Sequence, residues 1–358
     1  MRILYGVVGE GMGHAIRSGV VLRHLVDAGH EVVAMASDRA VDYLRKRLFD
    51  VRRIHGFHIV YEENRVRRGS TLWSNLLEGT GALPSQIVAY FDLIGDFRPE
   101  IVISDFESWV WLYAKVHGTP ILSIDNMQVI HRCRHPEELV SRHRTDFEVT
   151  RAFIQSKLPF CHHYFISTFF RPPIRKERTS LHPPILRPEI LAATPTRGDH
   201  LLVYQTAEGH QALVEALRDC GLECRIYGMR RGITEEQVEG RLHYRPFDEP
   251  RFVEDLASAR AVVAGGGFTL LGEAIYLRKP ILSVPVRRQF EQVLNAFYVE
   301  REGYGMAADE VDAARLGRFL DDLPRFEERL AAWSQDGNED LFRALDEKLD
   351  QAAAGLLT

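Results

Sequence analysis

The sequence predicts an α/β protein with two doubly wound, Rossmann-like domains and a cleft between them. Short apolar segments rich in β-branched residues alternate with amphipathic segments, which is typical of parallel strands that helices cover on both faces. A proline-rich segment at 171–198 interrupts this alternation once, and the pattern then begins again. The length of 358 residues, with 45% hydrophobic residues, suits about two globular domains.

The first half begins with an apolar strand at 2–8. A helix follows at 15–28, with apolar residues recurring on one face, and Gly29 ends it as a C-cap glycine would. Further strands of this half are expected at 31–37, 99–105, 119–125 and 163–168, and a further helix at 38–48. We therefore expect a first domain over 1–170 and a linker over 171–198.

The second half repeats the alternation. Its strands are expected at 200–206, 223–228, 259–266 and 279–286, and its helices at 209–221, 268–278 and 290–303. These elements define a second domain over 199–334. Residues 335–358 are predicted to form a C-terminal helix, with packing against the first domain as one alternative.

Composition narrows the classes of function. A net charge of −5 and a pI near 6.3 give no sign of nucleic-acid binding. Four cysteines are too few for a disulfide framework, and no signal peptide or apolar run of membrane-spanning length is visible, so we expect a cytoplasmic location. Basic residues slightly outnumber acidic ones in the first half, and a stretch at 52–77 mixes arginines with Trp73. Peripheral contact with the inner face of a membrane therefore stays open.

The most informative stretch begins with a glycine triplet. Gly265, Gly266 and Gly267 end a predicted strand, and Phe268 and Thr269 begin the next helix. Glycine lets the backbone approach a phosphate closely, and a helix N-terminus offers free N–H groups and a positive dipole end. These five residues are predicted to hold a diphosphate without a metal ion.

Acidic and amide side chains follow the triplet at informative positions. Glu273 lies one helical turn after Thr269, and its carboxylate can accept hydrogen bonds from both hydroxyls of a ribose. Glu291 and Gln292 begin another predicted helix near the same strand ends, where an acid and an amide can share the hydroxyls of a hexose. An exposed helix carboxylate is the alternative for Glu273.

This combination resembles the C-terminal donor motif of glycosyltransferases with the two-Rossmann B fold (GT-B). That motif has a glycine pair, then Ser/Thr-x-x-x-Glu, then Pro-x-x-x-Asp-Gln-x-x-Asn-Ala. Here six residues separate Pro285 from Gln292, and Glu291 replaces the usual aspartate. The resemblance implies that the loop at 243–250 borders the nucleotide base, with Phe247 as the apolar contact. A buried loop phenylalanine is the alternative for Phe247.

Residues 9–14 read GEGMGH between the first predicted strand and helix. A dinucleotide fingerprint, G-x-G-x-x-G, needs glycine at position 14, where this chain has His14. The turn is instead similar to the glycine-rich, Gly-His turn of GT-B UDP-glycosyltransferases and the cell-wall N-acetylglucosaminyltransferase. The chain as a whole looks closest to an uncharacterised bacterial and archaeal branch of that superfamily.

Because the donor motif lies in the second half, acceptor binding is assigned to the first half. Histidine titrates near neutrality, so His14 is suited to act as the base on an acceptor hydroxyl. Asp105, at the end of a predicted strand, resembles the aspartate that orients such a histidine. A packing role for His14, with Asp105 or Glu107 as the base, stays open. The candidates for acceptor binding are Gly11, Gly13, Arg17 and Glu107.

The sequence therefore predicts an inverting, metal-independent glycosyltransferase that moves a hexose from a nucleotide-diphosphate donor, a UDP-sugar, to a hydroxyl of a small-molecule or lipid-linked acceptor. The nucleotide sugar is a co-substrate, and neither a cofactor nor a metal site is expected, because the histidines and cysteines at 131–135 and 161–163 fit no tetrahedral zinc pattern. Two alternatives remain: a nucleotide-sugar 2-epimerase of the same fold, and a non-catalytic nucleotide-sugar-binding protein.

Overall fold

The computed structural model describes residues 1–9, 11–47, 49–54, 92, 94–206, 211–286 and 289–357. The chain divides into two compact units. The first unit contains Met1–Ile124, Lys157–His163 and Lys348–Thr358, and the second contains Asp125–Ser156 and Tyr164–Glu347. Most of the arginine-rich stretch at 52–77 lies outside the described residues.

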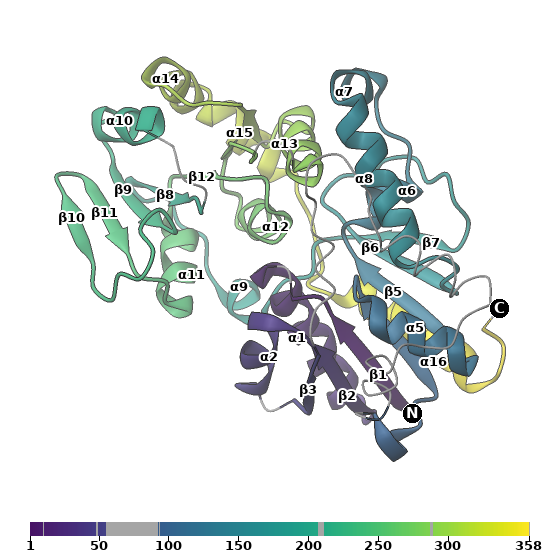
Figure 1. Ribbon diagram of the computed structural model, residues 1–358. Coiled ribbons are helices and arrows are strands. Elements are labelled where there is room, and N and C mark those ends of the chain that lie inside the picture. Colours follow the sequence, from purple (N-terminus) through teal and green to yellow (C-terminus); the bar gives the residue numbers. More distant parts are fainter. Residues whose placement is uncertain are drawn as a thin grey trace. The chain divides into compact units, whose positions relative to one another are not determined.

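The first unit is built on parallel strands in the order β3-β2-β1-β4-β5 (Figure 1). The strands are β1 (Arg2–Val7), β2 (Glu31–Ala36), β3 (Val51–Arg53), β4 (Ile101–Asp105) and β5 (Ile121–Asp125), and the helices are α1 (Met12–Asp27), α2 (Asp38–Arg45) and α5 (Ser108–His117), with a short 3₁₀ helix at Gly95–Phe97. The register places Val7 opposite Asp105 at the carboxyl ends of β1 and β4. The β1–α1 turn and the end of β4 are therefore neighbours.

The second unit contains a seven-stranded sheet with the order β10-β11-β9-β8-β12-β13-β14. All of its strand pairs are parallel except β10–β11. The strands are β8 (His200–Tyr204), β9 (Glu223–Tyr227), β10 (Gln237–Glu239), β11 (Leu242–Arg245), β12 (Ala261–Ala264), β13 (Ile281–Ser283) and β14 (Gly305–Ala307). In addition, β6 (His163–Ser167) pairs in parallel with β7 (Thr179–His182).

The remaining helices begin in the second unit, and α8 and α16 end in the first. They are α6 (Gln128–Arg132), α7 (Glu137–Arg142), α8 (Arg144–Lys157), α9 (Pro188–Ala192), α10 (Gln211–Asp219), α11 (Glu249–Ser258), α12 (Phe268–Tyr276), α13 (Phe290–Arg301), α14 (Ala313–Asp321), α15 (Leu323–Ala331) and α16 (Glu339–Ala353). Helices α10 and α14 lie side by side (Figure 1). Leu217 and Phe319 from these helices join Leu201 and Val263 of the sheet in one buried apolar cluster. Two parallel-dominated sheets with flanking helices confirm the predicted fold class.

Several elements differ from the sequence-based expectation. Helix α1 begins at Met12, three residues before the predicted start, so His14 belongs to its first turn. The segment at 171–198, expected as a linker, contains β7 and α9; Pro188 stands at the start of α9, a position where the missing N–H of proline costs nothing. Helices α7 and α8 and the antiparallel β10–β11 pair were not expected.

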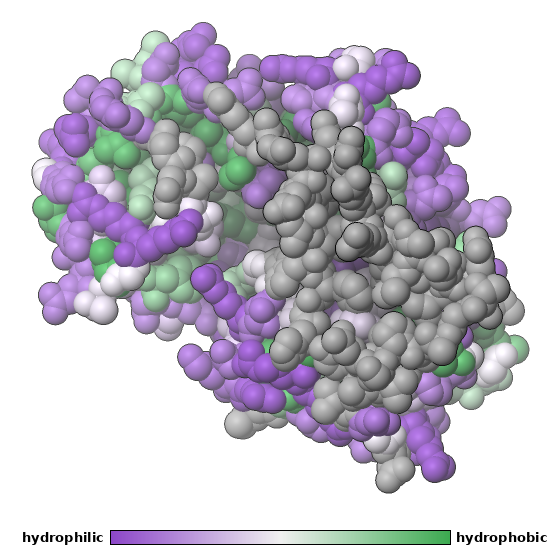
Figure 2. Space-filling view, in the orientation of Figure 1, coloured by the Kyte–Doolittle hydropathy of each residue, from purple (hydrophilic) through white to green (hydrophobic). Residues whose placement is uncertain are grey.

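The described surface is largely hydrophilic on the face that Figure 2 shows, with hydrophobic residues in small groups. The exposed large apolar side chains include Phe160, Phe247 and Leu356. Among the described residues, no helix has both the length and the apolar character needed to span a bilayer.

Candidate functional site

The β1–α1 turn positions His14 through a glycine conformation. Gly11 precedes the first helical residue and has a φ of 87°, a left-handed value that side chains other than glycine rarely adopt. A Cβ built on Gly11 would meet no atom of the described residues within 4 Å, so these residues leave space beside the turn. Gly13 follows within the first turn of α1, and the side chain of His14 is 15% exposed.

Asp105 lies beneath this turn and binds three side chains of α1. His14 Nδ1 is 2.8 Å from Asp105 Oδ1. Arg17 donates from Nε at 2.8 Å and from Nη2 at 2.6 Å to the two carboxylate oxygens, and Ser18 Oγ donates at 2.9 Å. The structure thus brings together the two residues predicted for proton transfer.

The charge of Asp105 is fixed by these partners. Burial raises the pKa of this fully buried carboxyl, but Arg17 and His14 outweigh burial and hold the pKa at about 2. Asp105 is therefore ionised at neutral pH. An ionised acceptor at Nδ1 favours the histidine tautomer that carries its proton there.

Two residues predicted to bind the acceptor are engaged elsewhere. Arg17 is 3% exposed, and its guanidinium is bound to Asp105. Glu107 is 4% exposed, and its carboxylate accepts a bond from the N–H of Val110 at 2.9 Å as the N-cap of α5. Burial raises the pKa of Glu107, and its backbone hydrogen bonds and Lys157 counter that rise. Both side chains support the local structure in this state.

In the second unit, the glycine triplet joins β12 to the N-terminus of α12. The N–H of Gly266 donates to Gln292 Oε1 at 3.1 Å, and Asn295 Nδ2 donates to the carbonyl of Gly266 at 2.9 Å. A Cβ on Gly266 would lie 2.3 Å from the carbonyl oxygen of Gln292. Helix α13 therefore packs so closely on the loop that only glycine fits there.

The other donor-site candidates lie around this loop. Glu273 is 2% exposed, and both of its oxygens accept bonds from Arg187, at 2.8 and 2.9 Å. The alternative of an exposed helix carboxylate is therefore excluded. Glu291, at the start of α13, accepts a bond from Asn126 Nδ2 at 2.6 Å. Phe268 is buried, whereas Gly267 is exposed and Thr269 is half-buried.

Phe247 lies on the surface between β11 and α11. It is 59% exposed, which excludes the alternative of a buried loop phenylalanine. Its ring lies 5.5 Å from that of Phe252 and 6.4 Å from that of Tyr227. An apolar ring held at the surface by two others can stack against a planar ligand.

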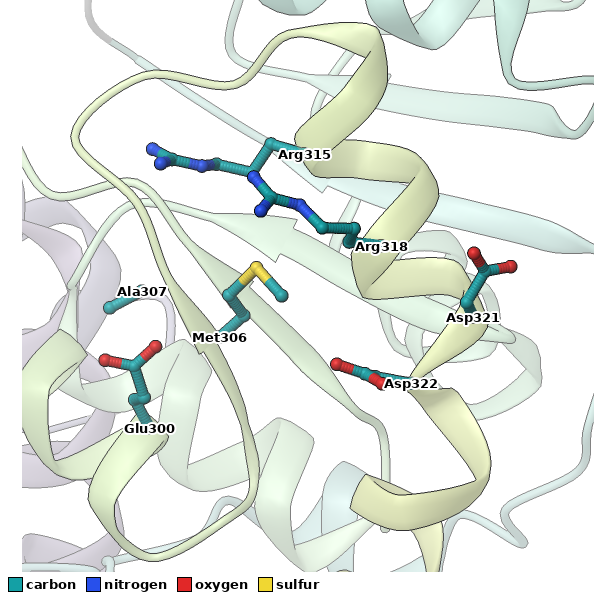
Figure 3. Close-up of a pocket in the computed structure, with 7 residues that line it drawn as sticks. All are labelled: Glu300, Met306, Ala307, Arg315, Arg318, Asp321 and Asp322. Carbon is teal, nitrogen blue, oxygen red and sulfur yellow. The ribbon is translucent and has the colours of Figure 1, made fainter.

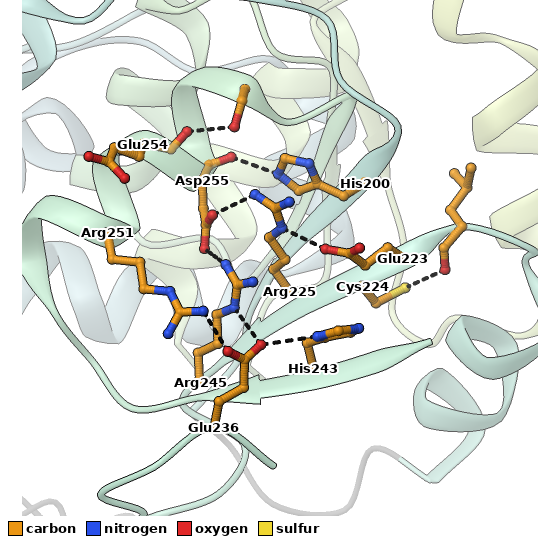
Figure 4. Close-up of polar contacts among 12 residues, drawn as sticks. His200, Glu223, Cys224, Arg225, Glu236, His243, Arg245, Arg251, Glu254 and Asp255 are labelled. Carbon is orange, nitrogen blue, oxygen red and sulfur yellow. Dashed lines mark hydrogen bonds and ion pairs between the residues drawn. The ribbon is translucent and has the colours of Figure 1, made fainter. Parts of the chain in front are cut away.

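A charged network holds the strands and helix that flank Phe247 (Figure 4). Asp255 of α11 is 4% exposed and is bound by Arg225 at 2.6 Å and by Arg245. Arg245 also contacts Glu236, which Arg251 and His243 bind as well. Sequence reasoning missed this network because its members come from four separate segments, and no local spacing connects them.

A separate hollow of about 520 Å³ lies between α13, β14 and α14 (Figure 3). Arg315 and Arg318 extend from α14 over Met306. The other lining residues are Glu300, Ala307, Asp321 and Asp322, and none of the predicted site residues is among them. Within the described ranges, no group of three or more His, Cys, Asp or Glu side chains is arranged to hold a metal ion.

Comparison with known proteins shows the family to which the chain belongs. The glycosyl transferase family 1 model matches residues 1–324. A protein of Methanosarcina mazei named as an uncharacterized glycosyltransferase is 27% identical over 335 residues, which cover 85% of each chain. A protein of Methanosarcina acetivorans with the same name is 23% identical over 390 residues and covers 99% of this chain and 98% of its own.

Solved structures show the same fold. The calicheamicin glycosyltransferase superposes with a TM-score of 0.64 at 18% identity, over 99% of this chain and 98% of its own. The kitacinnamycin glycotransferase superposes with a TM-score of 0.62 at 16% identity, over 96% and 95%. The chain belongs to glycosyl transferase family 1 and is a glycosyltransferase with the two-domain GT-B fold.

Proposed function

We propose that the chain transfers a sugar from a UDP-sugar to an acceptor hydroxyl, with inversion at the anomeric carbon. The observation that carries this proposal is the contact between His14 Nδ1 and the buried, ionised Asp105. A histidine whose Nδ1 donates to a carboxylate has Nε2 available to accept a proton. The same carboxylate stabilises the imidazolium that forms.

The transfer balances with these groups alone. The acceptor oxygen bonds to the anomeric carbon while the bond from that carbon to the diphosphate oxygen breaks. The acceptor proton passes to Nε2 of His14, and the electron pair leaves with the nucleoside diphosphate. A single displacement puts the new bond on the opposite face of the sugar, which is why we propose inversion. Arg17 serves this step indirectly, because it holds Asp105 in place.

For the donor, we assign the diphosphate to the glycine triplet and the first turn of α12. The first N–H groups of a helix have no partner within it, and the helix dipole is positive there. These groups can offset the charge of a diphosphate, so the proposal needs no metal ion. Glu273 is assigned to the ribose, and Glu291 and Gln292 are assigned to the hexose. The exposed ring of Phe247 is assigned to the base.

For the acceptor, we propose a small molecule or a lipid-linked molecule that enters over the β1–α1 turn. The space that the described residues leave beside Gly11 supports this entry, and Gly13 lies in the same turn. A small-molecule acceptor is in keeping with structural neighbours named for calicheamicin and spinosyn. We place the reaction in the cytoplasm, with peripheral contact to the inner membrane face for a lipid-linked acceptor.

A donor screen tests the proposal. The protein is incubated with UDP-, dTDP- and GDP-sugars, with and without a lipid extract, and free nucleotide and sugar products are measured. We expect UDP release that depends on an acceptor and continues in chelator, and a product whose anomeric configuration by NMR is opposite to the donor's. UDP release with a free 2-epimer as the only sugar product would contradict transfer, and recovery of activity only with magnesium or manganese would contradict metal independence.

A further inference from the structure

Arg187 joins two carboxylates of the second unit from a distant segment. Its side chain is 4% exposed. Nε and Nη2 donate to the two oxygens of Glu273 at 2.8 and 2.9 Å, and Nη1 donates to Glu249 Oε1 at 2.8 Å. Two parallel bonds between a guanidinium and a carboxylate fix both the position and the plane of the carboxylate. Glu273 is thereby held in one orientation on α12.

The segment that carries Arg187 is itself held in place. Asn338 accepts a bond from the N–H of Leu186 and donates to its carbonyl, both at 2.8 Å, and Gln335 donates to the carbonyl of Pro184 at 2.6 Å. A Cβ on Gly272 would lie 2.7 Å from the ring of Pro184. The segment therefore packs directly on α12, one residue before Glu273, and leaves Arg187 little freedom to move.

The buried Glu273 carboxylate needs the Arg187 cation to stay ionised. Burial raises the pKa of the Glu273 carboxyl, and Glu249 and Glu189 add to the rise, whereas Arg187 counters it. A carboxylate at 2% exposure without a cation would take up a proton. An ionised carboxylate offers about four acceptor positions, of which Arg187 uses two. The others accept no further bond from the described residues, and we assign them to two ligand hydroxyls.

We propose that Arg187 is the positioning residue of the nucleotide site, which holds Glu273 ionised and oriented so that its remaining acceptor positions bind the two ribose hydroxyls of the donor. This inference rests on the proposed function, since it assumes a nucleotide at the glycine triplet. Arg187 itself contacts Glu273 rather than the ligand. It acts from 86 residues away in the sequence.

The test compares two probes that differ only in the ribose hydroxyls, UDP and 2′,3′-dideoxyuridine diphosphate. Calorimetry gives the affinity of the wild type, Arg187→Gln and Glu273→Gln for each probe. We expect the wild type to prefer UDP by about tenfold or more, the range for hydrogen bonds to a charged group. Both variants should lose most of this preference and bind the dideoxy probe as the wild type does.

A pH series adds a readout that a merely structural role would not move. The preference of the wild type for UDP should stay flat between pH 6 and 8, because the two bonds from Arg187 hold the Glu273 carboxylate over this range. In Arg187→Gln the carboxyl has lost its cation, so the preference should return as pH rises and the carboxyl ionises. Arg225→Gln is the matched control: Arg225 also pairs with buried Asp255, and this variant should keep the wild-type preference.

Each outcome is decisive. If the wild type binds no nucleoside diphosphate, both the proposed function and this inference are wrong. If the wild type prefers UDP but Arg187→Gln weakens both probes equally, Arg187 is structural and the inference alone is overturned. Tighter UDP binding by Arg187→Gln would also overturn it, since Arg187 would then be occupying the hydroxyl positions. Should Arg187→Gln fail to fold by thermal melting, Arg187→Lys replaces it: one ammonium cannot bridge both oxygens, and an unchanged preference would sink the inference.

Discussion

At the scale of single residues, the main polar cluster of the candidate site in the first unit surrounds the carboxylate of Asp105. Asp105 accepts bonds from three side chains of α1, all within 3 Å. Arg17 Nη2 also lies 2.5 Å from His14 Nδ1 and donates to the same carboxylate oxygen that Nδ1 contacts. A guanidinium offers no acceptor, so a proton on Nδ1 can only be donated to Asp105, and the arginine contributes by fixing the carboxylate. Removal of the His14 side chain takes away the proposed base, whereas removal of the Arg17 side chain takes away the group that holds Asp105. The two changes should therefore affect turnover differently.

His14→Ala is expected to lower turnover by about 10²–10⁴-fold, the range for losing a general base. UDP affinity should stay near that of the wild type, because the glycine triplet belongs to the other unit. Steady-state kinetics and calorimetry with UDP measure the two effects. His24→Ala, in the last turn of the same helix, is the control. Wild-type turnover in His14→Ala would show that the histidine only packs.

The lowered pKa of Asp105 also predicts that the free energy of unfolding depends on pH in the acidic range. Its pKa falls from 3.8 to about 2 on folding, so its stabilising contribution is present above pH 4 and is lost as the pH falls towards 2. The difference corresponds to about 2 kcal/mol. Urea unfolding of the wild type and Asp105→Asn at pH 5 and pH 2 measures it. The gap between the two proteins should shrink by about that amount at the lower pH, and a constant gap would contradict the assignment.

At the scale of elements, the donor loop depends on how closely α13 approaches it. Gln292 Oε1 accepts bonds from the N–H groups of both Gly266 and Val286, and thus ties α13 to two strand ends. The loop is held by a helix that is predicted to carry the hexose contacts. Loop geometry and sugar recognition are therefore linked in one element.

Gly266→Ala is expected to disrupt this arrangement. The new methyl group would lie 2.3 Å from a backbone oxygen of α13, which cannot rotate away, so the helix or the loop must shift. We expect a loss of about 1–3 kcal/mol in the free energy of unfolding and weaker UDP binding. Gly267→Ala is the control for stability, because its Cβ would meet no atom of the described residues within 4 Å. Equal stability of the two variants would refute close packing at Gly266.

The limits of sequence reasoning are also clearest at this scale. Glu273 was found because helical spacing ties it to the glycine triplet, and Asp105 because it ends a predicted strand and resembles the aspartate that orients the histidine in similar glycosyltransferases. Arg187 was missed because nothing local marks it among the prolines of its segment. The same prolines hid β7 and α9. Contacts set by chain neighbours were predictable, whereas those set by packing between distant segments were not.

At the scale of the whole molecule, the two candidate clusters belong to different units. The His14–Asp105 pair lies in the first unit, and the glycine triplet with Glu273 and Phe247 lies in the second. Because the predicted donor residues all belong to the second unit, we expect that UDP alone, without a sugar or an acceptor, binds to groups of the second unit. Hydrogen–deuterium exchange can show which unit binds UDP, and the experiment does not require the acceptor to be known.

With UDP bound, we expect slower exchange in peptides that cover 245–249 and 265–273, and smaller changes in peptides that cover 12–27 and 101–105. Inorganic pyrophosphate should protect only the glycine triplet and the start of α12, because it lacks the ribose and base that are assigned to Glu273 and Phe247. The difference between the two ligands therefore maps the nucleoside. Protection by UDP confined to the β1–α1 turn would reverse the roles of the two units, and His14 would then have to be reconsidered as a nucleotide contact.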